Sequence, residues 1–335
     1  MTAKITAASI AFLAMLAGQA IGQIYDTNND VVQTCAGSGF SGYVDGVGQL
    51  TMFNDPNDIV ADSHSNLFVW DNGNYRIREI APNLTVTTFV GGGTGGQSSG
   101  IGTNFNFKPW VNTFSRMAID HNDTIWLASY GQSTGGLFYG CNLFKITSGA
   151  VITLASFQSL EPGGICVDSF GNIYISDWYF NKIYRVNTNG SLSVFAGSGN
   201  LGYADGNGIF TAFFSPYALA ADAADNIYVW DFGNRLIRRI DQNQNVTTFS
   251  GKYNITAKAD GFGTNAAFTS ISAMCFDGFG NLIIADDSSI RKISPMTNVV
   301  TMAGKFTLAG YANGAGNLAL FQKDSSTGIG NGACI

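Results

Sequence analysis

Short apolar runs alternate with small polar turns along almost the whole chain, and the runs return in the same order. Two units match closely: one has runs at 58–62, 66–71, 76–80 and 86–91, the other at 218–222, 226–231, 236–240 and 246–251. The runs are rich in β-branched and aromatic residues and are bounded by Gly, Asn and Asp, which is typical of strands. Each unit therefore predicts four antiparallel strands.

The unit repeats at a nearly constant distance. The aspartate that ends its first run recurs at Asp62, Asp120, Asp168, Asp222 and Asp277, at intervals of 58, 48, 54 and 55 residues. A four-stranded sheet with such a period is the blade of a β-propeller. The predicted blades cover about 58–92, 117–156, 164–197, 218–251 and 273–304. Blades pack on neighbours through both faces, which explains strands that are apolar on both sides.

The connections between units repeat as well. Asp-Gly-x-Gly begins at Asp45, Asp205 and Asp260, Asn313 begins a variant, and a phenylalanine follows each (Phe53, Phe213, Phe268 and Phe321). Asp-Gly and Asn-Gly suit tight turns that need a positive φ. The motif lacks the alternating oxygen ligands of a calcium loop. We expect turns here, each followed by a phenylalanine wedged between blades.

These repeats resemble the NHL repeat family over roughly residues 31–322. The resemblance rests on the recurring Ile-x-Val/Ala-Asp, on Gly-Asn-Ile/Leu-Tyr-Val/Ile-x-Asp, and on the asparagine before an Ile-Arg-Arg/Lys-Ile strand. It implies an all-β, six-bladed propeller. Propellers of this type are interaction modules, readers of ligands or RNA, and in some cases lyase-like or lactonase-like enzymes, so the resemblance does not fix the activity.

Closure of the ring is the uncertain part of the predicted fold. Residues 31–37 match the fourth strand of the unit and are expected to complete the last blade, since an orphan strand edge is a liability. The sixth connection reaches Phe321, but residues 322–335 are too few for the middle strands. We expect a sixth blade made of 31–37 and 322–335 that is incomplete, through truncation or through divergence of the end.

The first residues have the layout of a secretory signal peptide. A positive start at Lys4 precedes an apolar run of about 14 residues and then small residues up to Gly22. A spanning helix needs about 20 apolar residues, which no stretch of the chain provides. We expect a signal peptide at 1–22 and one propeller domain at 23–335, with secretion to the extracellular space or the periplasm.

Composition narrows the possible partners. The net charge is −6 and the charged fraction is 12%, which argues against binding to nucleic acid. With 45% hydrophobic residues the chain is not disordered. We predict a monomer without a membrane span, whose partner is a protein, a glycan or a small ligand.

Candidate site residues follow from the propeller architecture, because the inner strands start beside the central funnel. The residues expected around that mouth are Asp55, Asn57, Asp58, Arg116, Glu161, Ser215, Tyr217 and Ser272. Lactonase-like propellers hold a divalent cation there with acidic residues, and the cation polarises a carbonyl and activates water. In this chain Glu161 with Asp55, Asp58 or Asn57 would form such a site; the alternative is a polar rim that only solvates the mouth.

Other reactive residues have simpler interpretations. His64 and His121 fall in turns after strand-ending aspartates and cannot build a three-histidine zinc site. The cysteines Cys35, Cys141, Cys166, Cys275 and Cys334 are expected to be small buried hydrophobes, and their odd number leaves at least one free thiol. Candidate glycosylation sequons occur at Asn83, Asn122, Asn189, Asn245 and Asn254, a number that chance alone explains.

The sequence thus predicts a secreted, non-enzymatic β-propeller that binds a ligand through the funnel face and needs no cofactor. A lactonase-like hydrolase with a divalent cation at the funnel mouth is the alternative.

Overall fold

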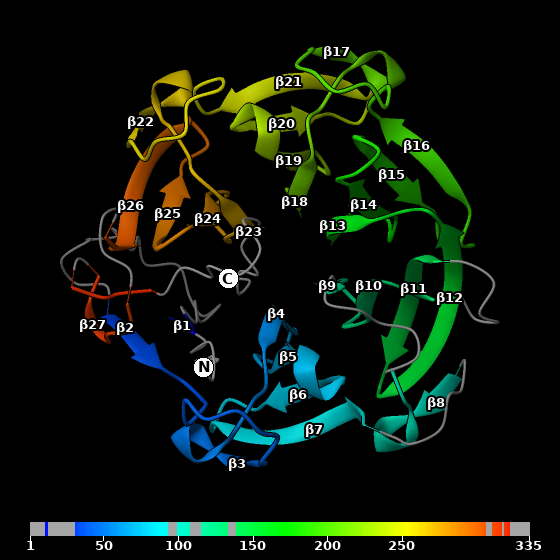
Figure 1. Cartoon of the computed structure of the whole chain (residues 1–335), viewed down its shortest axis with the longest axis vertical. Coiled ribbons are helices and arrows are strands. Elements are labelled where there is room, and N and C mark those ends of the chain that lie inside the picture. The colour runs from blue at the N-terminus through cyan, green and yellow to red at the C-terminus, as the bar shows by residue number, and fades with distance from the viewer. Residues whose placement is uncertain are drawn as a thin grey trace, which may run out of the picture.

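The computed structural model describes residues 11–12, 31–92, 99–107, 115–132, 139–305, 310–316 and 318–321. Its strands form radial antiparallel sheets around a common centre (Figure 1). The innermost strands β4, β9, β13, β18 and β23 surround that centre, while β7, β12, β16, β21 and β26 form the outer rim (Figure 1). The all-β propeller prediction is confirmed.

Each blade has four strands that follow one another in the sequence. Blade 1 consists of β4 (Pro56–Ala61), β5 (Leu67–Asp71), β6 (Arg76–Ile80) and β7 (Thr85–Gly91). Blade 2 consists of β9 (Ser115–Ile119), β10 (Ile125–Gln132), β11 (Tyr139–Thr147) and β12 (Ala150–Gln158). Blade 3 consists of β13 (Pro162–Val167), β14 (Ile173–Asp177), β15 (Lys182–Val186) and β16 (Leu192–Ala196).

The last two blades repeat the pattern. Blade 4 consists of β18 (Pro216–Ala221), β19 (Ile227–Asp231), β20 (Leu236–Ile240) and β21 (Asn245–Ser250). Blade 5 consists of β23 (Ile271–Phe276), β24 (Leu282–Asp286), β25 (Ser289–Ile293) and β26 (Asn298–Gly304).

Four blades carry a short fifth strand on their outer edge, contributed by the connection that enters the blade. These strands are β3 (Gly46–Val47), β8 (Ser99–Ile101), β17 (Gly206–Asn207) and β22 (Gly261–Phe262). A single 3-10 turn follows each of them, at Gly48–Leu50, Gly102–Asn104, Gly208–Phe210 and Gly263–Asn265. Two more 3-10 turns, Asn72–Asn74 and Phe232–Asn234, follow β5 and β19.

Blade 3 lacks this fifth strand. Its entering connection is only 159–161, between the end of β12 and the start of β13. The connections that enter blades 1, 4 and 5 contain Asp-Gly-x-Gly, and their second glycines, Gly48, Gly208 and Gly263, have φ values of 54°, 51° and 54°. Glycine adopts this left-handed conformation without a steric penalty, so the turn prediction for the motif is confirmed.

The described residues form five blades, so the prediction of six is wrong. The expected partial closure by the N-terminal strand is present, since Val31 and Val32 pair with Ala315 and Gly314 of the sixth connection. Between blades 5 and 1 lies a three-stranded sheet of order β1-β2-β27, formed by Ala11–Phe12, Val31–Thr34 and Gly314–Ala315. β27 belongs to the sixth connection, and the described residues that follow it, 316 and 318–321, form no further blade strand. Residues 322–335, predicted to contribute to that blade, lie outside the described residues, as does the predicted signal segment 1–22 except for β1.

The core lies between blades. Phe268, from the connection entering blade 5, packs in one buried cluster with Trp230 of blade 4 and Ile284 of blade 5. Phe53 and Phe213 are also buried, as expected for wedges. Within the described residues no helix is long and apolar enough to cross a membrane.

Candidate functional site

Residues at one end of the blades form what we call the funnel face, namely the starts of the inner strands and the ends of the second strands. Backbone pairing places these two ends side by side: Pro56 lies opposite Asp71, Pro162 opposite Asp177, and Pro216 opposite Asp231. The loops that follow the second strands therefore gather on the same face as the starts of the inner strands.

Two buried side chains bridge the inner strands of blades 2, 3 and 4. Arg116 on β9 donates from Nε to the carbonyl oxygen of Gly163 (3.1 Å) and from Nη2 to the hydroxyl oxygen of Tyr217 on β18. Gly163 gives the Tyr217 ring its room, since a Cβ there would lie 2.9 Å from Tyr217 Cδ2. Arg116 and Tyr217 thus serve packing between blades.

The remaining predicted mouth residues are spread around the ring. The buried Asp58 accepts the backbone N–H of Met117 (2.6 Å) and so ties blade 1 to blade 2, and the neighbouring Asn57 is buried too. Asp55 accepts from Asn72 Nδ2 (3.0 Å). Ser215 donates its N–H to Asn181 (2.8 Å), and Ser272 Oγ donates weakly to the carbonyl oxygen of Ala285 (3.4 Å).

These positions do not converge on a metal site. Asp55 and Asp58 lie at the start of blade 1, whereas Glu161 lies directly before the first strand of blade 3. In the part of the chain that the structure describes, no three His, Cys, Asp or Glu side chains lie close enough to hold a metal ion. The expected acidic cluster of Glu161, Asp55 and Asp58 is not assembled.

Sequence reasoning missed a charged triad that stands behind the funnel face in blades 1, 4 and 5. In each, a buried arginine on the third strand joins the aspartate that ends the second strand to the aspartate of the entering Asp-Gly-x-Gly turn. The triads are Asp71–Arg78–Asp45, Asp231–Arg238–Asp205 and Asp286–Arg291–Asp260. All three arginines are completely buried.

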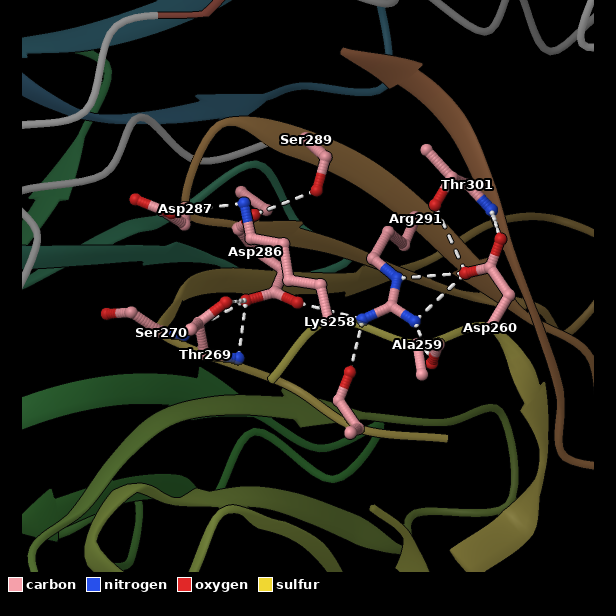
Figure 2. Close-up of polar contacts among 12 residues, drawn as sticks. Lys258, Ala259, Asp260, Thr269, Ser270, Asp286, Asp287, Ser289, Arg291 and Thr301 are labelled. Atoms are coloured by element: carbon pink, nitrogen blue, oxygen red, sulfur yellow. Dashed lines mark hydrogen bonds and ion pairs between the residues drawn. The ribbon is translucent and has the colours of Figure 1, made fainter. Parts of the chain in front are cut away.

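Blade 5 shows the full geometry of the triad (Figure 2). Arg291 Nη1 lies 2.8 Å from Asp286 Oδ2, and Nη2 lies 2.9 Å from Asp260 Oδ1. The guanidinium also donates to the carbonyl oxygens of Ala259 and Ala267, and it lies 4.9 Å from the ring centroid of Phe268. A buried charge is tolerated when it is paired and its hydrogen bonds are satisfied, and this arrangement meets both conditions.

Blade 2 has replaced the charged triad by neutral residues. Ser129, Phe144 and Ser99 stand at the positions of the three charged side chains. Ser129 Oγ lies 2.7 Å from Ser115 Oγ on the inner strand, so a hydroxyl pair takes the place of the carboxylate.

Blade 3 has kept the aspartate and lost its partners. Asp177 ends β14 and is completely buried. Tyr184 occupies the arginine position, and Phe180 occupies the position of Asn74 and Asn234, which donate to the aspartates of blades 1 and 4. Asp177 Oδ1 accepts the backbone N–H groups of Tyr179 (3.1 Å) and Phe180 (2.9 Å), while Oδ2 accepts from no described residue.

The surroundings of Asp177 disfavour the charged form of its carboxyl group. The pKa of Asp177 is raised to about 6, chiefly by burial and to a lesser extent by the Glu161 charge, while backbone hydrogen bonds from Phe180, Tyr179 and Glu161 lower it. Burial also raises the pKa of Glu161. Asp177 in turn contributes to the raised pKa values of Tyr184 and Cys141, for which burial is the larger cause. A buried carboxyl with an unsatisfied oxygen is expected at functional sites.

Aromatic side chains follow the buried aspartates of blades 3 and 4 on the funnel face, and Trp178 of blade 3 and Phe232 of blade 4 pack against the same core cluster. We call Trp178, Tyr179, Phe180, Phe214 and Phe232 the aromatic rim. Tyr179 is 60% exposed and Phe180 is 41% exposed, and their ring centroids are 5.0 Å apart. Blade 1 has Asn54, Asn72 and Asn74 at matching positions. Aligning the loops 72–75, 178–181 and 232–235 would have revealed this change from amides to aromatic rings.

The other predicted residues lie away from this region or in turns. His64 and His121 are exposed, and so are the sequon asparagines Asn83, Asn122, Asn189, Asn245 and Asn254. Cys141 and Cys166 are buried, whereas Cys35 and Cys275 are only partly buried, and all four are free thiols. Cys334 lies outside the described residues.

Comparison with known proteins shows the fold and leaves the family open. No family model matches the chain. Teneurin-1 of Gallus gallus is 27% identical over 244 residues, 62% of this chain and 9% of that protein. SUPPRESSOR OF QUENCHING 1 of Arabidopsis thaliana is 28% identical over 284 residues, 76% of this chain. The match spans 26% of that second protein, so the chain corresponds to a minor part of either relative.

Two solved structures from Bacteroides thetaiotaomicron share the architecture. A protein of unknown function has a TM-score of 0.67 at 18% identity, over 91% of this chain and 70% of its own. An auxiliary nutrient binding protein has a TM-score of 0.58 at 16% identity, over 90% of this chain and 67% of its own. Both likenesses support a β-propeller fold, and the NHL resemblance stays a prediction.

Proposed function

We propose that this chain is a secreted, non-enzymatic binding module that takes a protein, glycan or small ligand on the funnel face of blades 3 and 4. The observation that carries the proposal is the aromatic rim beside Asp177. Exposed aromatic rings offer large apolar area with little conformational freedom to lose, which suits them to recognition. A few convergent polar groups, here Asp177 and Glu161, would orient the bound molecule.

Two further observations support this assignment. The fold is one that a described nutrient binding protein also has, although fold alone does not determine function. The residues 1–22 have the layout of a signal peptide, which is the basis for proposing secretion.

A metal-dependent hydrolase is the weaker alternative. It would require Glu161 to meet Asp55 and Asp58 around one cation, and the described acidic residues form no such group. The rim of blades 3 and 4, by contrast, uses residues that lie together.

A screen of peptides, glycans and small molecules against the purified protein tests the proposal, with Tyr179→Ala and Phe214→Asn as rim variants. Phe170→Ala is the matched control, since Phe170 is an exposed phenylalanine in the turn at the opposite end of blade 3. Ligands of the funnel face should lose affinity for both rim variants and keep it for the control. Ligands that bind all three variants equally would place the binding surface elsewhere.

A further inference from the structure

In three blades the buried aspartate at the end of the second strand is paired with an arginine of the chain itself. In blades 1, 4 and 5 the Oδ2 atom of that aspartate lies 3.1, 3.0 and 2.8 Å from a guanidinium Nη1. Each guanidinium also meets a second carboxylate from the entering connection. Each guanidinium also packs against a phenylalanine ring, with the guanidinium carbon 5.1, 5.3 and 4.9 Å from the ring centroid. Two carboxylates and an aromatic ring therefore define the site.

Blade 3 keeps the buried aspartate of the triad, but Tyr184 replaces the arginine and no Asp-Gly-x-Gly turn supplies a second carboxylate. Asp177 supplies the first carboxylate, whose Oδ2 lacks a donor among the described residues. Glu161 lies beside the loop that follows Asp177, since its carbonyl oxygen accepts the backbone N–H of Trp178 (3.3 Å). Its carboxylate is a second acidic group at this end of blade 3, and it contributes to the raised pKa of Asp177. Tyr179, Phe180 and Tyr184 supply aromatic rings at and beside the loop that follows Asp177.

The access to this position also differs between blades. In blade 1 the entering connection covers Arg78, which donates to the carbonyl oxygens of Val44 and Met52. The connection into blade 3 is only 159–161 and has no such segment. The connection into blade 3 therefore does not cover the region that the connection into blade 1 covers around Arg78.

We infer that the ligand of the funnel face carries a guanidinium group that pairs with Asp177, as the chain's own arginines pair with the equivalent aspartates of blades 1, 4 and 5. Because Tyr184 occupies the arginine position of blade 3, the ligand's group reaches Asp177 from the side of Glu161 instead. This inference rests on the proposed binding function and names the ligand's chemical class. A planar guanidinium matches a carboxylate with two parallel hydrogen bonds and stacks on aromatic rings, which an ammonium group does less well. The group can belong to an arginine of a peptide or to a small guanidinium compound.

Binding of N-acetyl-L-arginine amide, measured by calorimetry at pH 7.5, tests the inference. The neutral isostere N-acetyl-L-citrulline amide should bind at least about tenfold more weakly, since it lacks the charge that strengthens the hydrogen bonds. Asp177→Asn should weaken arginine binding by a similar factor. Glu79→Gln, which changes the only other glutamate and lies in blade 1, should leave it unchanged.

A second variant tests the inference while keeping the Asp177 carboxylate in place. Phe180→Asn with Tyr184→Arg restores the two donors that Asp231 has in blade 4, so the chain's own arginine should pair with Asp177 and abolish binding of the probe. Equal affinity for arginine and citrulline, no arginine binding by the wild type, or binding retained in the rebuilt variant would overturn the inference. A neutral ligand that depends on Tyr179 would overturn it too, while leaving the proposed binding function intact.

An arginine-containing peptide separates the two sources of the group. If a peptide with one arginine binds at least about tenfold more tightly than the amide, the aromatic rim contributes contacts and a peptide partner is indicated. If both bind equally, a small guanidinium compound is the better match.

Discussion

Blades 3 and 4 are neighbours with the same strand order, and each has a buried aspartate at the end of its second strand, but only the aspartate of blade 4 is paired with an arginine. In blade 4, Asp231 Oδ2 receives both Arg238 Nη1 (3.0 Å) and Asn234 Nδ2 (2.7 Å). In blade 3 both donors are aromatic residues, and Asp177 Oδ2 has no donor among the described residues. The same position of the repeat therefore holds a satisfied ion pair in blade 4 and an unsatisfied buried carboxyl in blade 3.

The largest expected effect concerns the intact triad. Arg238→Met leaves the completely buried Asp231 without its cation, and breaking a buried ion pair costs about 3–5 kcal/mol. Urea denaturation should show this loss in the free energy of unfolding. Arg185→Met, on the third strand of blade 3, should cost less than about 1 kcal/mol, because Arg185 is partly exposed and forms no such triad. Similar losses for both variants would refute the distinction.

The pH dependence of stability should distinguish the blade 3 carboxyl. The folded-state pKa of Asp177 is raised to about 6 from an ordinary value near 4, so between these pH values the folded chain keeps a proton that the unfolded chain releases. This group's contribution to stability therefore falls as pH rises, by about 3 kcal/mol in total.

Denaturation of wild type and Asp177→Asn between pH 4 and pH 8 measures that contribution. The variant should gain stability relative to wild type as pH rises through about 6, and the difference should be smallest near pH 4. A difference that does not change with pH would show that Asp177 does not titrate in this range.

A smaller effect is expected from restoring one missing donor. Phe180→Asn places an amide where Asn234 donates in blade 4, and a hydrogen bond to a charged group contributes about 1.5–3 kcal/mol. Because part of the Phe180 ring packing is lost, we expect a net gain of about 1 kcal/mol at pH 7. Phe170→Asn, in an exposed turn, should change stability by less than about 0.5 kcal/mol. A loss of stability in Phe180→Asn would indicate that the ring packing outweighs the hydrogen bond.

The smallest effect on stability is expected at the rim. Tyr179 is 60% exposed, so Tyr179→Ala should change the free energy of unfolding by less than about 0.5 kcal/mol. The same variant should lose affinity for ligands of the funnel face. Calorimetric melting combined with a binding titration separates the two readouts, and a large stability loss would assign the ring a packing role.

Much of the fold was predictable because the repeat shows in short motifs of neighbouring residues. The period of the strand-ending aspartates gave the blades, and the glycine turns gave the connections. The count of six failed because the run 31–37 and the connection to Phe321 resemble parts of a blade, whereas a blade needs its middle strands as well. Residues 322–335 are too few for those middle strands, so the sixth unit was already recognisable from the sequence as partial.

The candidate site was predictable only in part. Glu161 stands out in the sequence because the chain has only two glutamates, whereas Asp177 looks like any aspartate at the end of a strand. The triads join residues such as Asp45 and Arg78, which are 33 positions apart, so a single unit does not reveal them. Comparing third strands would have shown arginine at 78, 238 and 291 and tyrosine at 184, and hence which aspartate had lost its cation.

One matched pair of substitutions tests the central claim most directly. Asp177→Asn and Asp231→Asn make the same chemical change at equivalent positions, and equilibrium unfolding at pH 7 compares them. We predict opposite signs: Asp231→Asn loses about 3 kcal/mol because Arg238 is left buried with one weaker partner. Asp177→Asn gains about 1–2 kcal/mol because an unsatisfied buried charge is removed. A loss of stability in Asp177→Asn comparable to that in Asp231→Asn would contradict the account.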